Sequence, residues 1–483
     1  MSTIERPGRS LLATFLLFAL AACGGGGGST SKELVSISVT SASTSVTAGL
    51  MQQLSATGTY SDSSTANLTS TVTWSSATPA NASVNAQSGL VTTIVVGSAK
   101  IVATLNSVSG SLALTVTPPT QGWALTSSPI TSVYGGFTAT LLADGTVLMA
   151  GGYGVINPAG SNPSMATAAI YNPVTGAWTS TGSMMIARDG HSATLLADGT
   201  VLVAGGESCT ATEISGMCPL LASAEIYNPA TGKWSATGNM TTATFEQLAV
   251  LLPTGMVLIA GGSTQCPTAM CNLEPSISAE IFDPVAGSWT ATNAVQSGAG
   301  ALTVLADGTA LALGLSAPAA EIYNPALGGW ASAAGPSFTA DTATLLLGGS
   351  VLAAGGTTSC GLTLCLVNTV QIYTPSAGTW ASAGAMNYAR VHHTATLLKN
   401  GNVFVAGGTG CLGNCSIGPY STLASAEIYD SNSGVWNEIS NMIEARSGQP
   451  AILLSDGNML VIGGDQLANP NGFKSITAEI YYP

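Results

Sequence analysis

Three arginines and three histidines are the residues of this chain best suited to bind an anionic group or a metal ion. Beyond the N-terminal leader, the arginines are Arg188, Arg390 and Arg446, and the histidines are His191, His392 and His393. Each arginine stands three residues before one position of a repeated sequence. A guanidinium binds carboxylate and sulfate groups through paired hydrogen bonds. The predicted ligand-binding arc therefore comprises the arginines, the residues three positions after them, and the residue in the place of the arginine in the first repeat: Arg188, Arg390, Arg446, His191, His393, Gln449 and Tyr134.

The same arginines have a structural alternative, in which they bond loop carbonyls or neighbouring glutamates. The two interpretations stay open at this point. They differ in what lysine would do, because lysine keeps the charge but loses the planar fork. In a ligand site the change to lysine should weaken binding, and in a structural site it should lower the melting temperature.

The elements that must position these residues are seven repeats between Phe137 and Tyr482. Each repeat has a leucine-rich strand, a turn of the Asp-Gly kind, a strand ending in Gly-Gly, a loop, and Ala-Glu-Ile-Tyr or a close variant. Asp-Gly turns join strands as hairpins. Six copies continue to a tryptophan, whereas the seventh lacks one and Trp123 lies just before the first copy. This offset predicts a ring closed by its own N-terminal strand. Repeats of this length with four short strands are typical of propeller blades.

The repeats resemble kelch repeats. The resemblance rests on Arg188 to Leu196, Gly205-Gly206, Ala224 to Pro229, and Gly232 to Trp234. It implies an all-β fold, a seven-bladed kelch β-propeller over residues 119–483. The loops between the second and third strands are long in every repeat but the fourth. Since binding is usually placed on long loops of a rigid scaffold, we predict that this loop face binds the ligand.

Kelch propellers include galactose-oxidase-like copper enzymes, whose site uses two tyrosines, two histidines and a cysteine cross-linked to one tyrosine. Tyr388, His392 and His393 are the candidates here, but adjacent strand residues point to opposite faces. No cysteine is left for the cross-link, and the chain ends at Pro483 without the C-terminal domain that supplies a histidine in those enzymes. We therefore predict no catalytic residue, no metal, no cofactor and no enzyme activity. A carbohydrate-active enzyme using paired carboxylates stays an alternative, with Asp189, Glu246, Asp341 and Glu444 near the rim.

Eight cysteines fall in pairs within the long loops. In an exported chain, disulfides are the default interpretation, and each loop has too few ligands for zinc. The predicted bonds join Cys209 to Cys218, Cys266 to Cys271, Cys360 to Cys365, and Cys411 to Cys415.

The N-terminus predicts export and lipid anchoring. Arg6 and Arg9 precede an apolar run that is too short for a permanent membrane helix. Leu20-Ala21-Ala22-Cys23 resembles a bacterial lipobox, so residues 1–22 are predicted to be a signal peptide and Cys23 the lipidated residue. Residues 23–32 form a Gly/Ser tether. Gly24 follows where an aspartate would favour the inner membrane, which implies an outer-membrane lipoprotein facing the periplasm or the cell surface.

Residues 33–118 read as a small β-sandwich with one tryptophan. They resemble the bacterial Ig-like group 2 domain, on Val72 to Ser76, Ser88 to Val91, and Gly97 to Ala99. The resemblance implies a spacer. The net charge of the whole chain is −13, which argues against a nucleic-acid partner.

These features together predict a lipid-anchored envelope protein for binding or adhesion. Its expected partner is a protein, a peptide or a glycan. The alternatives are a galactose-oxidase-like or other carbohydrate-active propeller enzyme, and a purely structural envelope component.

Overall fold

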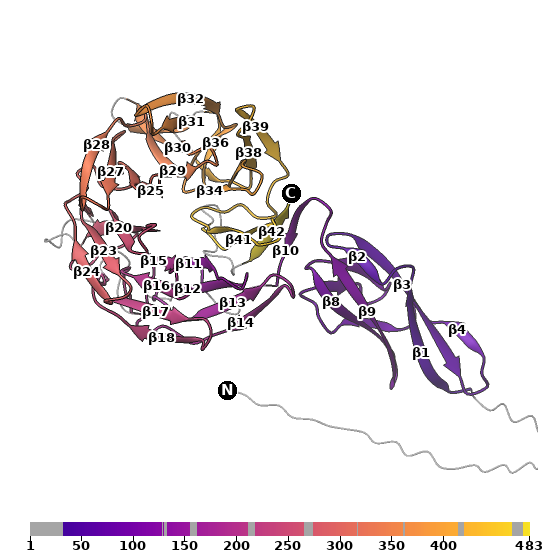
Figure 1. Ribbon diagram of the computed structural model, residues 1–483. Helices are drawn as coiled ribbons and strands as arrows, with labels where there is room; N and C mark the ends of the chain where they lie inside the picture. The colour runs from indigo at the N-terminus through magenta and orange to yellow at the C-terminus, as the bar shows by residue number, and fades with distance from the viewer. Residues whose placement is uncertain are drawn as a thin grey trace, which may run out of the picture.

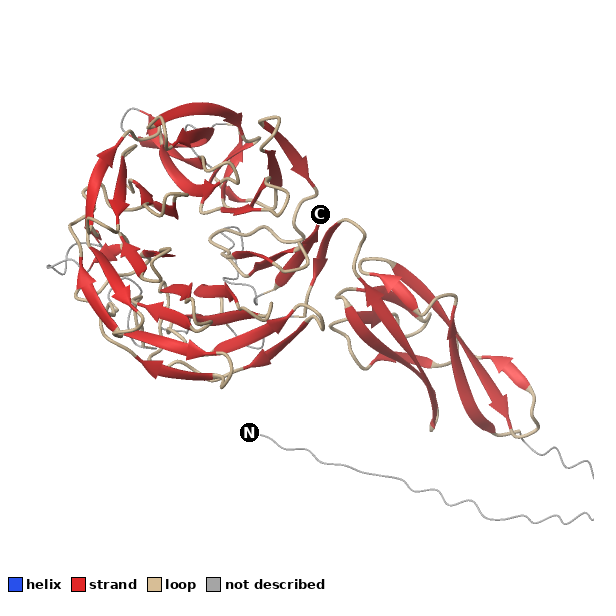
Figure 2. Cartoon of the chain, viewed as in Figure 1, coloured by secondary structure: helices blue, strands red, loops and turns tan. Residues whose placement is uncertain are grey.

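The computed structural model describes residues 32–127, 129, 133–154, 162–210, 218–264, 274–315, 317–360, 363–413, 420–465 and 477–483. Over these ranges the chain consists of strands, turns and loops without a helix, so the all-β prediction is confirmed (Figure 2). It follows that no helix able to cross a membrane occurs in the described ranges. The predicted signal peptide and Cys23 lie outside them.

The N-terminal segment folds into two packed sheets. The first contains β1 (Leu34–Ser41), β3 (Met51–Tyr60), β7 (Leu90–Thr93) and β6 (Ala82–Val84), with β4 (Thr65–Asn67) paired to β3. The second contains β2 (Ser45–Thr47), β9 (Val108–Thr117), β8 (Gly97–Leu105) and β5 (Thr73–Ser76). Trp74 lies in the core between them, and its indole donates to the Thr69 carbonyl over 2.8 Å. Gly89 passes so close that a Cβ there would lie 2.6 Å from the Trp74 ring.

Seven four-stranded sheets form the rest of the described chain. The four strands of each sheet are called a, b, c and d in their hydrogen-bonded order, and strand a lies at the centre of the ring. Sheet 1 contains β11 (Gly135–Leu141), β12 (Val147–Tyr153), β13 (Ala168–Asn172) and β14 (Ala177–Ser180). Sheet 2 contains β15 (Ser192–Leu195), β16 (Val201–Ala204), β17 (Ala224–Asn228) and β18 (Lys233–Ala236). Sheet 3 contains β19 (Leu248–Leu251), β20 (Val257–Ala260), β23 (Ala279–Asp283) and β24 (Ser288–Ala291). Sheet 4 contains β25 (Ala301–Val304), β26 (Ala310–Leu313), β27 (Ala320–Asn324) and β28 (Gly329–Ala333). Sheet 5 contains β29 (Thr339–Leu345), β30 (Val351–Cys360), β31 (Thr363–Thr374) and β32 (Thr379–Ala385). Sheet 6 contains β34 (Thr394–Leu397), β35 (Val403–Ala406), β38 (Ala426–Asp430) and β39 (Val435–Ile439). Sheet 7 contains β40 (Ala451–Leu453), β41 (Met459–Ile462), β42 (Ala478–Tyr482) and β10 (Gly122–Leu125).

Five shorter strands belong to the loops between strands b and c or d and a. They are β21 (Ser263–Thr264) with β22 (Glu274–Pro275), and β33 (Tyr388–Val391) with β36 (Thr409–Leu412) and β37 (Ser421–Thr422).

The seven sheets follow one another around a ring (Figure 1). The a strand of each sheet contacts the a strand of the next, and β40 of sheet 7 contacts β11 of sheet 1. Strand d of sheet 7 is β10, from the other end of the ring sequence, and it pairs antiparallel with β42. This is the place that the position of Trp123 predicts.

The b strands explain the uninterrupted apolar runs in the sequence. In β16, β20, β35 and β41 every residue is buried, because neighbouring sheets cover both faces. An apolar cluster fills each interface between neighbouring sheets, including the one between sheets 7 and 1.

An aromatic pair across strands c and d repeats in every sheet. In sheet 2, the rings of Tyr227 and Trp234 are 5.0 Å apart, and the Trp234 indole donates to the Gly182 carbonyl in the preceding connection. Trp123 makes the same contacts at the closure, 5.2 Å from Tyr481 and with its indole donating to the Ser440 carbonyl over 2.7 Å. The closing strand is therefore held as strand d of sheet 2 is.

The N-terminal sandwich touches the ring at this closing strand. Val95 forms a parallel β-bridge with Leu125 of β10. A cavity of about 240 Å³ between the two parts is lined by Thr115 to Pro118 and by the c–d turn of sheet 1, Pro173 to Gly176.

We predict that Trp123→Ala lowers the free energy of unfolding by about 3 kcal/mol, because it removes a half-buried indole from the closing strand. Trp234→Ala is the matched control and should have a similar effect, since its contacts are equivalent. Urea unfolding of the full-length variants measures both. A Trp123→Ala protein as stable as the wild type would show that the ring is held closed in another way.

Candidate functional site

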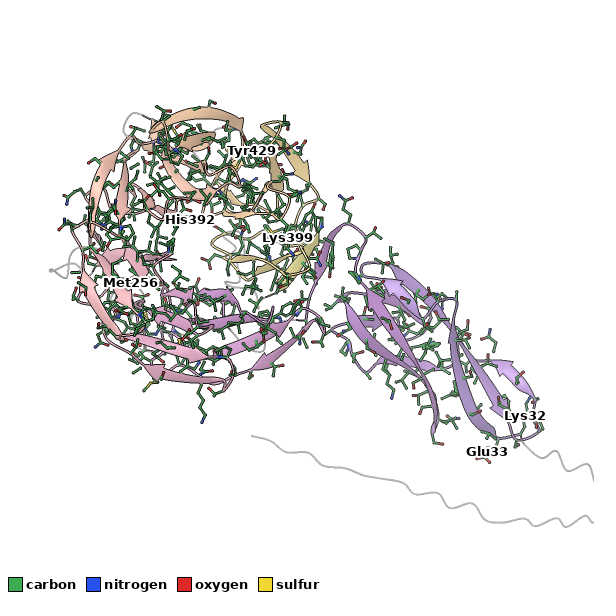
Figure 3. All side chains as sticks on the ribbon, viewed as in Figure 1. Lys32, Glu33, Met256, His392, Lys399 and Tyr429 are labelled. Atoms are coloured by element: carbon green, nitrogen blue, oxygen red, sulfur yellow. A yellow bond between two sulfur atoms is a disulfide. The ribbon has the colours of Figure 1, made fainter. Side chains whose placement is uncertain are left out.

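A cavity of about 460 Å³ lies at the centre of the ring, between the starts of the a strands of sheets 1, 2, 3, 6 and 7. Its polar lining residues include Tyr153, Asp189, Glu246, His392 and Asp465. Figure 3 shows His392 at the inner edge of the ring. The cavity is thus rich in groups that exchange protons.

Two repeat positions supply these groups. One is the residue directly after the Gly-Gly pair, which is Tyr153 in sheet 1, Glu207 in sheet 2 and Asp465 in sheet 7. The other comprises the two residues just before His191 and just before the equivalent residue of each other repeat, such as Gln247 in sheet 3. Short β-bridges join the two positions, as between Asp189 and Glu207. The bridges therefore gather side chains from distant parts of each repeat at the mouth of the cavity.

Glu246 and His392 adopt a backbone conformation that disfavours side chains. Their φ angles are 56° and 54°, in the left-handed region, while sheets 1, 2 and 7 have glycine at the same repeat position. The conformation turns an amide toward the preceding sheet: Glu246 N donates to Gly190 O over 2.7 Å, and Gly190 N donates to Gly136 O over 2.8 Å. A non-glycine residue held in this region costs about 1–3 kcal/mol, and such strain concentrates at functional sites.

Three carboxyl groups in or beside the cavity have a pKa above the ordinary value. Burial raises the pKa of Asp189 to about 6, and the nearby charge of Glu246 adds to the effect. Burial and the charges of Asp189 and Glu246 raise the pKa of Glu207 to about 7. Partial desolvation also raises the pKa of Glu246, an exposed residue, against the opposing charge of His392. Since the folded chain then binds protons more tightly than the unfolded chain, these groups lower the free energy of unfolding as the pH rises from about 4 to about 7. Carboxyl groups that destabilise the fold at neutral pH are typical of active sites.

Hydrogen bonds orient two of these carboxylates. Tyr153 donates to Asp465 Oδ1 over 2.6 Å, and burial together with the Asp465 charge raises the pKa of the Tyr153 phenol. Ser164 donates to Asp189 Oδ2 over 2.5 Å. The Ser164 hydroxyl also accepts the backbone amide of Cys209 over 2.7 Å, which ties Asp189 to a disulfide loop.

The three arginines of the predicted arc do not reach the cavity. Their side chains are buried, and each pairs with the glutamate of its own sheet's c strand: Arg188 with Glu225 at 2.9 Å, Arg390 with Glu427 at 2.6 Å, and Arg446 with Glu479 at 2.7 Å. Each also donates from Nη1 to the carbonyl of the first glycine of the Gly-Gly pair. This geometry favours the structural alternative.

Most other residues of the predicted arc fasten one sheet to the next. His191 Nε2 lies 2.9 Å from Thr138 Oγ1, and His393 Nε2 lies 3.2 Å from Thr342 Oγ1. Gln449 donates to Ala406 O over 2.8 Å. Of the predicted arc, His191 lines the cavity, whereas His393, Gln449 and the half-buried Tyr134 are not among its lining residues.

Sequence reasoning named Asp189 and Glu246 only as unpaired rim carboxylates and missed Tyr153, Glu207 and Asp465. The other two rim candidates have different roles: Asp341 Oδ2 lies 3.0 Å from His393 Nδ1, and Glu444 accepts the Thr477 hydroxyl over 2.7 Å. A comparison of the residues that follow Gly-Gly in each repeat would have shown the missed ones.

The disulfide prediction is confirmed for Cys209–Cys218 and Cys360–Cys365. Cys411 is also disulfide-bonded. Cys266, Cys271 and Cys415 lie outside the described residues.

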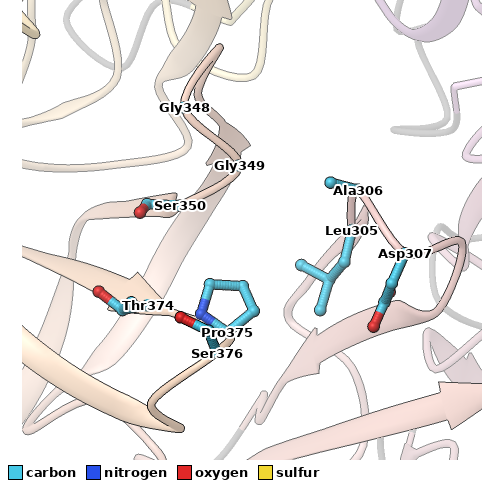
Figure 4. A pocket seen from close by; sticks show the side chains of 9 residues that line it. All are labelled: Leu305, Ala306, Asp307, Gly348, Gly349, Ser350, Thr374, Pro375 and Ser376. Carbon is cyan, nitrogen blue, oxygen red and sulfur yellow. The ribbon is translucent and has the colours of Figure 1, made fainter.

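A second cavity, of about 350 Å³, lies on the face of the short turns between sheets 4 and 5 (Figure 4). Its lining includes the turns at Leu305 to Asp307, Gly348 to Ser350, and Thr374 to Ser376. The Asp307 carboxylate accepts the amide and the hydroxyl of Thr309. Because the Asp307 carboxylate is already hydrogen-bonded within its own turn, this cavity offers little chemistry.

We predict that Glu427→Gln lowers the free energy of unfolding by about 3–5 kcal/mol, because it leaves the buried Arg390 guanidinium without a counter-charge. Glu438→Gln, on the exposed side of the neighbouring d strand, is the matched control and should change stability by less than about 0.5 kcal/mol. Urea unfolding separates the two results. Equal stability of both variants would contradict a structural role for the pair.

Comparison with known proteins confirms the N-terminal assignment. Residues 34–116 match the family described as bacterial Ig-like domain (group 2). A stretch of 84 residues, 17% of the chain, is 50% identical to Ice-binding protein 1 of Shewanella frigidimarina (strain NCIMB 400), and it spans 9% of that protein.

The chain also resembles a solved structure described as a novel fungal alcohol oxidase with catalytic diversity among the AA5 family, in complex with copper. The TM-score is 0.56 with 17% sequence identity, over 75% of this chain and 76% of that chain. At this identity the likeness shows the fold alone. This likeness to an oxidase contradicts the prediction of no enzyme activity, which rested on the unsuitable placement of His392 and His393, the lack of a free cysteine and the lack of a C-terminal domain.

The residues of this cavity do not fit the ligand set of a galactose-oxidase-like copper site, as given by the sequence resemblance: two tyrosines, two histidines and a cross-linked cysteine. His392 faces the cavity, but His393 is buried beside Asp341. Within the described ranges, the one group of histidine, cysteine or carboxylate ligands with metal-like spacing is Glu207, Cys209 and Cys218, whose two sulfurs are bonded to each other. The chain thus shares a fold with an oxidase, without the copper ligands expected of a galactose-oxidase-like enzyme.

Proposed function

We propose that the ring is a seven-bladed kelch β-propeller and that its central cavity is the active site of a carbohydrate-active enzyme, with Glu246 and His392 as the acid–base pair. The seven four-stranded sheets, the closing strand β10 and the fold likeness support the architecture. The open end of a channel lined by a strands is a common place for a ligand pocket.

One observation carries the assignment of Glu246 and His392. At a repeat position where sheets 1, 2 and 7 use glycine, these two residues hold a left-handed backbone and bring ionisable side chains to the cavity. Glycine would avoid the strain. Retaining a strained acid and a strained base at equivalent places of two sheets is best explained by the chemistry of their side chains.

The reaction class that fits these groups is hydrolysis of a glycosidic bond. The raised pKa keeps the Glu246 carboxyl able to donate a proton to the leaving glycosidic oxygen as the bond to the anomeric carbon breaks. The His392 imidazole accepts a proton from a water molecule, whose oxygen forms the new bond to that carbon. Phe137 and Phe245 give the cavity apolar surface against which a sugar ring can pack.

We predict that Glu246→Gly and His392→Gly each abolish release of reducing ends from a panel of neutral and amino-sugar oligosaccharides, while leaving the melting temperature equal or higher. Glycine restores the residue that suits the left-handed backbone and removes only the reactive side chain. The reverse change, Gly448→Ala, adds a Cβ with no atom within 4 Å at φ 66°, and it should lower stability by about 1 kcal/mol through backbone strain alone. Full activity in both glycine variants, or no hydrolysis by the wild-type protein, would refute the proposed reaction.

We further propose that the protein is a lipoprotein of the bacterial outer membrane, joined by lipid at Cys23 and held out by the Ig-like segment. The lipobox-like Leu20 to Cys23 and the tether after it support this. The partner predicted from the sequence is an envelope or extracellular protein, peptide or glycan, and the glycan agrees with an active site of this class.

We expect Cys23→Ala to move the protein from the detergent-extracted membrane fraction to the soluble fraction, because no lipid can then be attached. Immunoblots of the two fractions measure the change, with Cys411→Ala as a control that keeps the anchor. A Cys23→Ala protein that stays in the membrane fraction would exclude anchoring at this residue.

A further inference from the structure

The wall of the central cavity is incomplete on one side. Sheets 1, 2, 3, 6 and 7 line the cavity, whereas no described residue of sheets 4 and 5 does. The acid and the base of the proposed site stand at the two ends of this lining, because Glu246 belongs to sheet 3 and His392 precedes sheet 6. The gap between them therefore faces sheets 4 and 5.

A row of backbone hydrogen bonds at the inner rim is interrupted at the same place. Glu246 N donates to Gly190 O of the preceding repeat over 2.7 Å. His392 O accepts Gly448 N of the following repeat over 2.8 Å. All four residues have the left-handed backbone, which the equivalent residues of sheets 4 and 5 lack: Ala299 and Ala340. Bonds of this kind thus end at Glu246 on one side of the gap and at His392 on the other.

Sheet 4 has the shortest connection between strands b and c. This connection is confined to residues 314–319, whereas residues 205–223 join the same strands in sheet 2. Gly314 N donates to Ala319 O over 2.9 Å, so the chain turns back directly after strand b. In sheet 5, by contrast, strands b and c continue outward as a paired hairpin as far as Cys360 and Thr363. The gap beside Glu246 is therefore least obstructed over sheet 4.

Leu315 provides surface at this low part of the rim. It stands in the place of the second glycine of the Gly-Gly pair and is 39% exposed. A Cβ added to Gly300 would lie 3.0 Å from Leu315 Cα, so Leu315 lies against the sheet 4 equivalent of His191 and Gln247, which line the cavity. The described residues that follow in the connection are exposed or half-buried and uncharged: Ala317, Pro318 and Ala319. An uncharged, partly apolar surface thus leads from the cavity rim across sheet 4, and the apolar faces of sugar rings can pack on such a surface.

We propose that the cavity encloses the non-reducing end of a glycan chain and that the rest of the chain leaves the cavity over sheet 4, in contact with Leu315. The inference rests on the proposed carbohydrate-active function and names its substrate class, which is glycan chains that are shortened from this end. Glu246 donates its proton to the glycosidic oxygen, and that oxygen departs with the remainder of the chain. The remainder therefore lies on the Glu246 side of the broken bond, where sheet 4 follows sheet 3. The sugar with the anomeric carbon stays in the cavity and receives the water oxygen, while the water proton passes to His392.

Oligosaccharides with a fluorescent label at the reducing end test the proposal on the full-length protein in detergent. The probes are labelled hexamers and dimers derived from cellulose, amylose and chitosan. We expect the label of a cleaved hexamer to appear first on the pentamer and then on successively shorter chains, because each cut removes sugar from the unlabelled end. Chromatography of samples taken early in the reaction measures this order.

A leucine truncation tests the path over sheet 4. Leu315→Ala should raise the KM for the cleaved hexamer about fivefold, because it removes apolar surface beneath the part of the chain outside the cavity. The same variant should leave the KM for the dimer within about twofold of the wild-type value, since the dimer hardly extends beyond the cavity. Leu364→Ala is the matched control, at an exposed leucine on the sheet 5 hairpin, and it should leave both KM values unchanged.

The outcomes separate this inference from the function on which it rests. Labelled fragments of all lengths in the earliest samples overturn attack from the chain end. An equal effect of Leu315→Ala on hexamer and dimer, or no effect on either, overturns the path over sheet 4. Either result leaves the proposed hydrolysis standing. Cleavage of none of the probes by the wild-type protein refutes the proposed function, and this inference with it.

Discussion

A buried glutamate in the c strand is the interaction on which the ring depends. In the sequence Ala-Glu-Ile-Tyr its carboxylate accepts the backbone amides of the connection that enters the sheet: Glu225 binds Met185 N at 2.6 Å, and Glu479 binds Ile443 N at 2.6 Å. These amides lie in an irregular segment, where pairing with a neighbouring strand cannot supply their hydrogen bonds. In sheets 2, 6 and 7 an arginine adds the counter-charge and binds the Gly-Gly carbonyls. In the sheets that carry this glutamate, the connection is thereby fixed before it brings its side chains to the centre of the ring.

This locking explains how the cavity can hold strained residues. The connection ends a few residues before Glu246 or His392, and its fixed course leaves these positions little choice of backbone angle. The inter-sheet hydrogen bond from Glu246 N to Gly190 O then keeps the left-handed conformation. The hydrogen bonds of the buried glutamates stabilise the fold. They offset the free-energy cost of the strained backbone and of the buried carboxyl groups at the centre of the ring.

The sequence carries much of the fold and little of the site. Apolar runs, turns of the Asp-Gly kind, Tyr–Trp pairs and the displaced Trp123 are local patterns with one physical meaning each, so the all-β class, the sheets and the disulfides within loops could be predicted. Whether Arg390 meets solvent or Glu427 depends on packing between strands that are distant in sequence. The direction of the Glu246 side chain depends on the sign of one φ angle. The residues after Gly-Gly differ from one repeat to the next, so their shared place beside the cavity depends on the fold.

The pairing of β10 with β42 has a consequence for how the chain acquires its structure. It joins Trp123 to Tyr481 across nearly the whole length of the ring sequence, so sheet 7 cannot be completed until both ends of that sequence have come together. Until then the incomplete ring exposes a sheet edge and apolar faces that attract other chains. The unclosed ring is thus the state most exposed to aggregation, because its edge and apolar faces are covered only when β10 pairs with β42.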